Sequence, residues 1–200
     1  ASRRCIRWAC SISLSLVLLL SVRRASASSR FCCISGLNSQ CVAIIAGASL
    51  KIPAKIHLEI ETGMNRTGLG EDQLDAVIMK ILDNRDLLIM EGVCTHYAGA
   101  ESIANFVRVN RQISRFNKTC KKIQQLGLDP KYRHTACSAA AINYPRTRMD
   151  LVRIGIMQYG FWPSIETYIQ FMHGRKDRFD PLDRVISWKS KIMSIKKVEE

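Results

Sequence analysis

Residues 54–96 have the sequence AKIHLEIETGMNRTGLGEDQLDAVIMKILDNRDLLIMEGVCTH, and this stretch decides the fold class. Residues 54–61 alternate between apolar and polar side chains, which predicts a strand. Residues 71–84 have acidic side chains in the first turn and apolar ones at helical spacing, which predicts a helix with one buried face. Residues 87–96 predict a second strand. A strand, a helix and a strand at this spacing are typical of a parallel sheet covered by helices.

The same alternation of elements continues toward the C-terminus. A long helix is predicted over 101–126, ending at Gly127, and is followed by a short strand over 133–136, a short helix over 138–143 and a strand over 151–159. Four such strand and helix units make half of an eight-stranded (β/α) barrel. We therefore predict an α/β fold that is a partial TIM barrel. Because an open half barrel leaves strand edges unpaired, we expect that part of the barrel is missing.

Each predicted strand ends in a cluster of polar or glycine residues. These clusters are residues 59–66, 94–97, 134–138 and 152–156. In (β/α) barrels the functional side chains gather at the carboxyl ends of several parallel strands. The pattern therefore indicates an enzyme.

The net charge of +13 suggests nucleic acid or an acidic membrane, but the charge is unevenly distributed. Residues 1–50 have six Arg and no acidic residue, whereas residues 51–200 have 24 basic and 17 acidic residues. Lys and Arg between 108 and 122 lie at helical spacing among apolar residues, which favours a solvated helix face over a nucleic-acid groove. None of the eight Cys has the spacing of a zinc site, so we expect no structural metal.

Both ends of the chain differ from its centre. Residues 1–45 are rich in Ser, Cys and Arg around an apolar run, which fits a secretory signal, an organelle transit peptide or a misread reading frame. We favour the last, and expect this segment to be disordered and unrelated to a barrel spanning 46–180. Residues 185–195 alternate again, which predicts that 181–200 begin a truncated β domain. The expected location is cytoplasmic, or secreted or organellar if the first 30 residues are a real targeting peptide.

The strand ends, taken in order, resemble those of alanine racemases of the pyridoxal-phosphate barrel type. The matching segments are HLEIETGMNRTG (57–68), EGVCTHYAGAE (91–101), HTACSAAA (134–141) and MDLVRIGIMQYGFWPS (149–164). The resemblance covers about residues 44–198 and implies barrel strands five to eight. It also implies pyridoxal 5'-phosphate as cofactor, alanine as substrate for D-alanine and peptidoglycan supply, and a homodimeric complete enzyme without nucleic-acid or membrane partners.

The resemblance assigns cofactor contacts to the last two strand ends. Ser138 would bind the phosphate through its hydroxyl and N–H, and Gly155 and Ile156 would offer backbone N–H groups. The residues alone favour a helix N-cap for Ser138 and a tight packing turn for Gly155, and the resemblance reverses that preference. Arg153 matches the arginine that faces the pyridine nitrogen. An arginine in the middle of an apolar strand is costly to bury without a partner, which supports a functional role.

Further roles follow from the resemblance at the earlier strand ends. Arg66 matches an arginine at the cofactor's phenolic oxygen, and His96 matches a histidine that supports the tyrosine base. Glu59 stands where many family members have a carbamylated lysine, and we hypothesise that its carboxylate orients Arg66 directly. Cys137 replaces the usual Asn beside the phosphate serine.

The catalytic lysine and tyrosine of the family lie outside the matched region. The resemblance therefore implies an alanine racemase fragment that is inactive by itself, with Arg66 and His96 in supporting roles. Alternatives are a broad-specificity amino-acid racemase of the same fold, a single-barrel cofactor carrier, and a non-catalytic basic binding protein. The last leaves Arg153, Ser138 and the strand ends unexplained.

Overall fold

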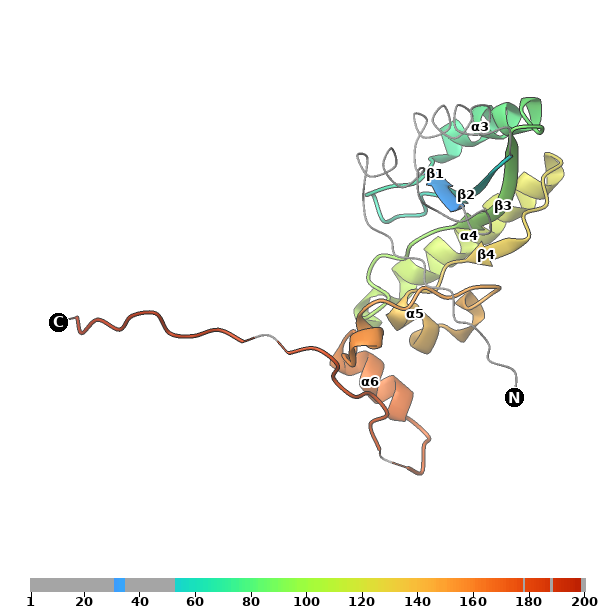
Figure 1. Cartoon of the computed structure of the whole chain (residues 1–200). Coiled ribbons are helices and arrows are strands. Elements are labelled where there is room, and N and C mark those ends of the chain that lie inside the picture. The colour runs from blue at the N-terminus through green and yellow to red at the C-terminus, as the bar shows by residue number, and fades with distance from the viewer. Residues whose placement is uncertain (1–30, 35–52, 178, 188, 199–200) are drawn as a thin grey trace, which may run out of the picture.

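The computed structural model describes residues 31–34, 53–177, 179–187 and 189–198 (Figure 1). Within these residues the chain forms a four-stranded sheet of order β1-β2-β3-β4, and each neighbouring pair is parallel. The strands are β1 (Phe31–Ile34), β2 (Ala54–Glu59), β3 (Leu88–Cys94) and β4 (Tyr132–His134). Since all pairs are parallel, the carboxyl ends of the strands meet at one edge of the sheet.

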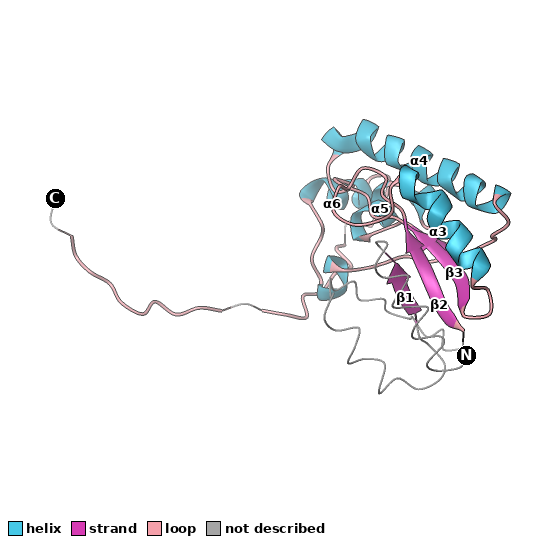
Figure 2. Ribbon diagram, turned by 90° about the horizontal axis from the view of Figure 1, so that it is seen from above, coloured by secondary structure: helices cyan, strands magenta, loops and turns pink. Residues whose placement is uncertain are grey.

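The helices are arranged around this sheet. The long helices α3 (Glu71–Asp83) and α4 (Phe106–Gln125) lie together over one of its faces (Figure 2). Two shorter helices, α5 (Ser138–Asn143) and α6 (Ile165–Met172), follow β4. Three short 3-10 helices complete the described part: η1 (Ile103–Asn105), η2 (Pro145–Thr147) and η3 (Ile156–Tyr159). This is the β, α, β, α order of a (β/α) barrel, with an unclosed sheet.

The core lies between the sheet and the two long helices. Alternate residues of β2 point into it, and Ile56 and Leu58 are fully buried. Helix α3 adds Val77 and Ile78, and α4 adds Phe116, all of them 0% exposed. Burying a side chain of this size contributes roughly 1.5–3 kcal/mol, so this layer fixes how the helices sit on the strands.

Most of the predicted elements are confirmed, with ends that differ by a few residues. Helix 138–143 matches α5, and 71–84 matches α3 to within one residue. The long helix begins later than predicted, because the Ser102 side chain accepts a hydrogen bond from the Ala104 N–H at 3.3 Å and starts η1 instead. Its end is as predicted: Gly127 has a φ of +90°, a conformation that glycine adopts at no steric cost.

The strand predicted over 151–159 is wrong. This segment makes two backbone hydrogen bonds alongside β4, from the Asp150 N–H to the Arg133 carbonyl (3.1 Å) and from the Arg153 N–H to the Ala136 carbonyl (2.9 Å). At Gly155 the chain turns, and 156–159 form η3. The apolar run has no second neighbour among the described residues, and Leu151 and Val152 are 41% and 43% exposed. A strand needs a continuous ladder of backbone bonds, which is not formed here.

Strand β1 lies within 1–45, the segment expected to be unrelated to the barrel, and for 31–34 that expectation is wrong. Its backbone pairs with β2 in register from Phe31 opposite Lys55 to Ile34 opposite Leu58. Four residues among Ser and Cys give too little periodicity to predict a strand. The remaining residues of 1–45 lie outside the described part of the chain.

The strand predicted over 185–195 is not formed by the described residues of that segment. They are extended and unpaired, apart from the Val185 N–H, which donates to the Tyr159 carbonyl at 3.3 Å. The apolar side chains Ile192 and Ile195 are 81% and 84% exposed. Alternation alone does not form a strand without a partner, so a β domain beginning at 181 stays a prediction.

No helix of the described residues has both the length and the apolar character needed to cross a membrane.

Candidate functional site

The predicted site residues gather at the carboxyl edge of the sheet. Arg66 lies in the loop after β2, and His96 lies in the loop after β3. Ser138 begins α5, four residues after β4 ends, and Arg153 and Gly155 lie in the segment that hydrogen-bonds alongside β4. The fold therefore places residues from distant parts of the sequence at one end of the strands, as the sequence predicted.

Ser138 and Gly155 are in direct contact. The Ser138 side chain is 5% exposed, and its Oγ accepts a hydrogen bond from the Gly155 N–H at 2.9 Å. The helix N-cap interpretation of Ser138 is wrong, because Cys137 holds the cap position and makes no side-chain cap bond. Ser138 is instead the first helical residue. A hydroxyl and a backbone N–H thus meet beside the start of a helix, where N–H groups have no intrahelical acceptor.

The space beside Gly155 is open. A Cβ added to Gly155 would meet no atom within 4 Å, and Ile156, the first residue of η3, is 46% exposed. The packing-turn interpretation of Gly155 therefore finds no support, since no neighbour presses on it. The Ser138 hydroxyl and the backbone N–H groups at Gly155 and Ile156 are donors of the kind that a phosphate group accepts from, and the Gly155 N–H donates to Ser138 Oγ in this structure.

Arg153 spans the ends of two strands. Its Nη2 donates to the carbonyl of Thr95, directly after β3, and to that of Thr135, directly after β4, at 3.4 Å in the second case. Among the described residues, none of the ion pairs includes Arg153 or Arg66. The guanidinium is held by neutral oxygens, so its positive charge is not neutralised by a carboxylate.

His96 lies within the field of both arginines. Its pKa is lowered from 6.5 to about 4, mainly by burial and also by the charges of Arg153 and Arg66, while the charge of Glu101 opposes this shift. The imidazole is therefore neutral at neutral pH. A neutral histidine among cations can accept a hydrogen bond on one ring nitrogen and donate on the other.

Glu59 has a different partner from the one we hypothesised. Its Oε1 accepts a hydrogen bond from the Thr67 hydroxyl at 3.1 Å, and no ion pair joins it to Arg66 within the described residues. Thr67 is adjacent to Arg66, so the carboxylate holds the loop rather than the guanidinium. A direct role of Glu59 in orienting Arg66 stays a prediction.

A buried pair of histidines, not predicted from the sequence, lies below this edge of the sheet. His57 Nδ1 of β2 and His134 Nε2 of β4 are 2.7 Å apart, and each side chain is 8% exposed. The two strands are separated by β3, whose Gly92 makes room: a Cβ there would lie 2.6 Å from the His57 ring. Burial and the charge of Arg153 lower the pKa of His134 to about 3. Both histidines lie within predicted strands, and this position in the sequence could have indicated that they are buried.

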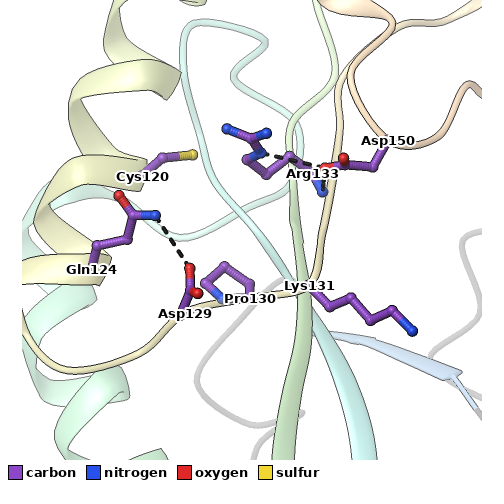
Figure 3. A pocket seen from close by; sticks show the side chains of 7 residues that line it. All are labelled: Cys120, Gln124, Asp129, Pro130, Lys131, Arg133 and Asp150. Carbon is purple, nitrogen blue, oxygen red and sulfur yellow. Dashed lines mark hydrogen bonds and ion pairs between the residues drawn. The ribbon is translucent and has the colours of Figure 1, made fainter.

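A polar pocket of about 270 Å³ lies at the opposite end of β4, beside α4 (Figure 3). Four of its polar side chains form two hydrogen-bonded pairs. Arg133 Nε lies 3.3 Å from Asp150, and Gln124 Nε2 donates to Asp129 at 3.2 Å. Burial raises the pKa of the Cys120 thiol to about 11. The thiol in this pocket is thus not an activated nucleophile, and none of the predicted site residues lines the pocket. In the described residues no group of three or more His, Cys, Asp or Glu could hold a metal ion.

Comparison with known proteins shows the family to which this chain is related. The sequence model of the family described as "Alanine racemase, N-terminal domain" matches residues 32–163. This match begins close to the start of β1, whereas the resemblance seen in the sequence began at about residue 44. The alanine racemase of Leptospira interrogans is 32% identical over 145 residues, which are 72% of this chain and 36% of that protein.

Two solved structures support the same relationship. The alanine racemase of Streptomyces lavendulae matches with a TM-score of 0.66 and 27% identity, covering 68% of this chain and 36% of that one. The alanine racemase of Bacillus anthracis, determined with bound L-Ala-P, matches with a TM-score of 0.53 and 34% identity, covering 57% of this chain and 30% of that one. The chain thus spans about a third of the length of these relatives, and by its fold, its strand ends and these matches it belongs to the alanine racemase family.

Proposed function

We propose that this chain forms the part of an alanine racemase that holds the phosphate and the ring nitrogen of pyridoxal 5'-phosphate. The observation that supports this best is the contact between Ser138 and Gly155, with open space beside it, next to an arginine that has no carboxylate partner. Ser138 would offer its hydroxyl and Ile156 its backbone N–H to the phosphate, and the Gly155 N–H, which donates to Ser138 Oγ in this structure, would turn to the phosphate on binding. When bound, pyridoxal phosphate supplies an electron sink that acidifies the α-carbon of an amino acid.

Arg153 would face the ring nitrogen. A guanidinium keeps its protons at any working pH, so it can donate a hydrogen bond to that nitrogen without protonating it. The carbonyls of Thr95 and Thr135 already hold its Nη2, which fixes the direction of the remaining donors. We propose that this arrangement limits the electron sink and so favours racemisation over side reactions.

His96 and Arg66 would support the reaction from the neighbouring loops. With a pKa near 4, His96 stays neutral and can hold a proton-transferring hydroxyl by a hydrogen bond. Arg66, exposed in the loop after β2, would contact the phenolic oxygen of the cofactor. Both roles follow the family resemblance and are proposals for this chain.

The whole enzyme's activity is likewise a proposal, because this chain matches about a third of its relatives' length. We propose racemisation of alanine in a cytoplasmic homodimer, in which further residues supply the covalent lysine and the tyrosine base. The Bacillus anthracis relative with bound L-Ala-P supports an alanine-like ligand. For the chain by itself we expect noncovalent cofactor binding, no new visible absorbance band on adding pyridoxal phosphate, and no racemase activity.

The test is a binding titration of the purified chain with pyridoxal 5'-phosphate and with pyridoxal, which lacks the phosphate. Ser138→Ala should weaken binding of the phosphorylated form by roughly threefold to tenfold, because one hydrogen bond contributes about 0.5–1.5 kcal/mol. Binding of pyridoxal should change little. Ser114→Ala, at an exposed position of α4, is the matched control and should leave both affinities unchanged. Equal binding of the two compounds by the unmodified chain would contradict the proposed phosphate site.

A further inference from the structure

Helix α4 contacts both of the loops that carry Arg66 and His96. Three of its polar side chains, Arg108, Gln112 and Arg115, are spaced by four and three residues and so lie on one face of the helix. All three donate to backbone carbonyls of these loops. The function proposed above does not account for these contacts.

Gln112 holds the loop after β3. Its side chain is 1% exposed, its Oε1 accepts from the Ala98 N–H at 3.0 Å, and its Nε2 donates to the Ala98 carbonyl at 3.3 Å. Ala98 is two residues after His96. Because one planar amide satisfies both the donor and the acceptor of the same residue, it restricts the rotation of the loop backbone as well as its distance.

The two arginines hold the loop after β2. Arg108 Nη2 donates to the Gly63 carbonyl at 3.0 Å, and Arg115 Nη1 donates to the Thr62 carbonyl at 3.3 Å. Gly63 also lies against Gln112: a Cβ added there would be 3.2 Å from the glutamine Cγ. The backbone that leads to Arg66 is therefore bound on the same helix face that binds Ala98.

We propose that Gln112, assisted by Arg108 and Arg115, is a positioning residue that sets the distance between Arg66 and His96. This inference rests on the proposed function, since it concerns how two groups of that site are held. Another side-chain link between the loops in the described residues is made by the Thr95 hydroxyl, which lies 2.8 Å from the Thr62 hydroxyl and 2.7 Å from the Ile60 carbonyl. That link lies at the strand ends, whereas Ala98 and Gly63 lie farther along the loops.

Arg66 and Arg153 make such a restraint necessary. Two like charges near one histidine repel each other, and neither has an ion-pair partner among the described residues. Arg66 lies in the loop after β2, and Arg153 contacts the loop after β3 through the Thr95 carbonyl, so holding the two loops together also limits how far these charges can separate. The hydrogen bonds from one face of α4 hold both loops in place before a ligand binds. They do so without a carboxylate, which would compete with an anionic ligand for the arginines.

The test uses Gln112→Leu, which keeps a side chain of similar volume, one atom shorter, but removes both hydrogen bonds. Amide hydrogen exchange and the NMR titration of His96 are measured in the free chain. We expect the Ala98 amide to exchange at least about tenfold faster relative to the core amide of Val93, because it loses its acceptor. The pKa of His96 should rise by at least about half a unit as the arginines move away and water enters.

Gln124→Leu is the matched control, since it makes the same replacement at an exposed position of the same helix. A folded Gln112→Leu chain with unchanged Ala98 exchange and an unchanged His96 titration would overturn the proposal, whatever its melting temperature. If that variant does not fold, the exposed Arg108→Met decides. It should shift the backbone resonances of residues 63–66 and the pKa of His96, and an unchanged pair of readings would overturn the proposal.

These readings need no ligand, so they separate this inference from the proposed function. Failure of pyridoxal phosphate to bind the unmodified chain would contradict the proposed function and leave the loop measurements intact. Normal cofactor binding together with unaltered loops in Gln112→Leu would contradict the positioning role alone.

Discussion

The two ends of the sheet both present arginine side chains, but they use them differently. At the amino end of β4, Arg133 faces Asp150 inside a pocket of about 270 Å³ (Figure 3). At the carboxyl end, Arg153 is held by backbone carbonyls, and the structure gives it no carboxylate partner among the described residues. The arginine at the carboxyl end, which has no carboxylate partner, is therefore a better indicator of an anion-binding site than the cavity at the amino end.

The reason is electrostatic. An arginine already paired with a carboxylate gains little from a second anion, because the pair is nearly neutral at a distance. An arginine held by neutral oxygens keeps its full charge while its orientation is fixed. We therefore expect an anionic cofactor or substrate to bind at the carboxyl end of the sheet, although the pocket of Figure 3 lies at the amino end.

The largest expected effect concerns the amino-end pocket. With a pKa raised to about 11 by burial, the Cys120 thiol has little thiolate at pH 7.5. Alkylation of Cys120 by iodoacetamide should be at least about a hundredfold slower than that of an unstructured cysteine peptide, because the thiolate is the nucleophile. Mass spectrometry of the Cys120 peptide measures the rate, and the chain unfolded in guanidinium is the control. A rate within tenfold of the free peptide would mean that this pocket is chemically active after all.

The next effect concerns the arginines themselves. Arg153→Leu should weaken binding of pyridoxal 5'-phosphate at least tenfold, since hydrogen bonds to charged groups contribute about 1.5–3 kcal/mol. Arg133→Leu makes the same change at the opposite end and should leave the affinity unchanged. Isothermal titration calorimetry of both folded variants measures this contrast. If both lose affinity equally, the distinction between the two ends fails.

The sequence predicted the elements that have a strong period of their own. Helix α3 buries residues 74, 77 and 78, which repeat at helical spacing. Strand β2 buries residues 56 and 58, which repeat at the spacing of a strand. It did not predict β1, which is four residues long, nor the loss of a strand over 151–159. In that segment the alternation is present, but pairing depends on a neighbour that sequence periodicity does not describe.

For the site, the sequence predicted which residues would meet but not how they would be held. Ser138 and Gly155 are in contact, and Arg153 lies at the ends of β3 and β4, while the cofactor contacts that the resemblance assigns to them stay predictions. The two hydrogen bonds between Gln112 and Ala98 were not predicted, because a glutamine on a helix of mostly polar residues resembles part of a solvated face. Only packing shows that it is buried.

A third effect is the dependence of stability on pH. The folded-state pKa of His134 is about 3 and that of His96 about 4, both below the unfolded value of 6.5. As pH falls from 6.5 toward 4, the unfolded chain takes up protons that the folded chain does not. The stability present above pH 6.5 is therefore lost across this window.

His134→Gln should make this loss shallower, because it removes one group protonated only on unfolding. One such proton changes the slope by about 1.4 kcal/mol per pH unit. Urea unfolding at pH 6.0, 5.5 and 5.0 measures the slope, and the exposed His173→Gln is the matched control. Equal slopes for His134→Gln and the unmodified chain would show that the buried pair accepts protons in the folded state.

The smallest effect is expected for the amino-end ion pair. The side chains of Arg133 and Asp150 are 51% and 36% exposed, and exposed pairs contribute about 0–1 kcal/mol. The backbone N–H of Arg133 still donates to the Asp150 carboxylate at 2.8 Å, a bond that replacing the side chain leaves in place. Arg133→Leu should therefore change the free energy of unfolding by less than about 1 kcal/mol in urea titrations, and less still in high salt, where exposed charges are screened. A larger loss would mean that the ion pair supports the sheet, and the two ends would then differ in structural importance as well as in charge.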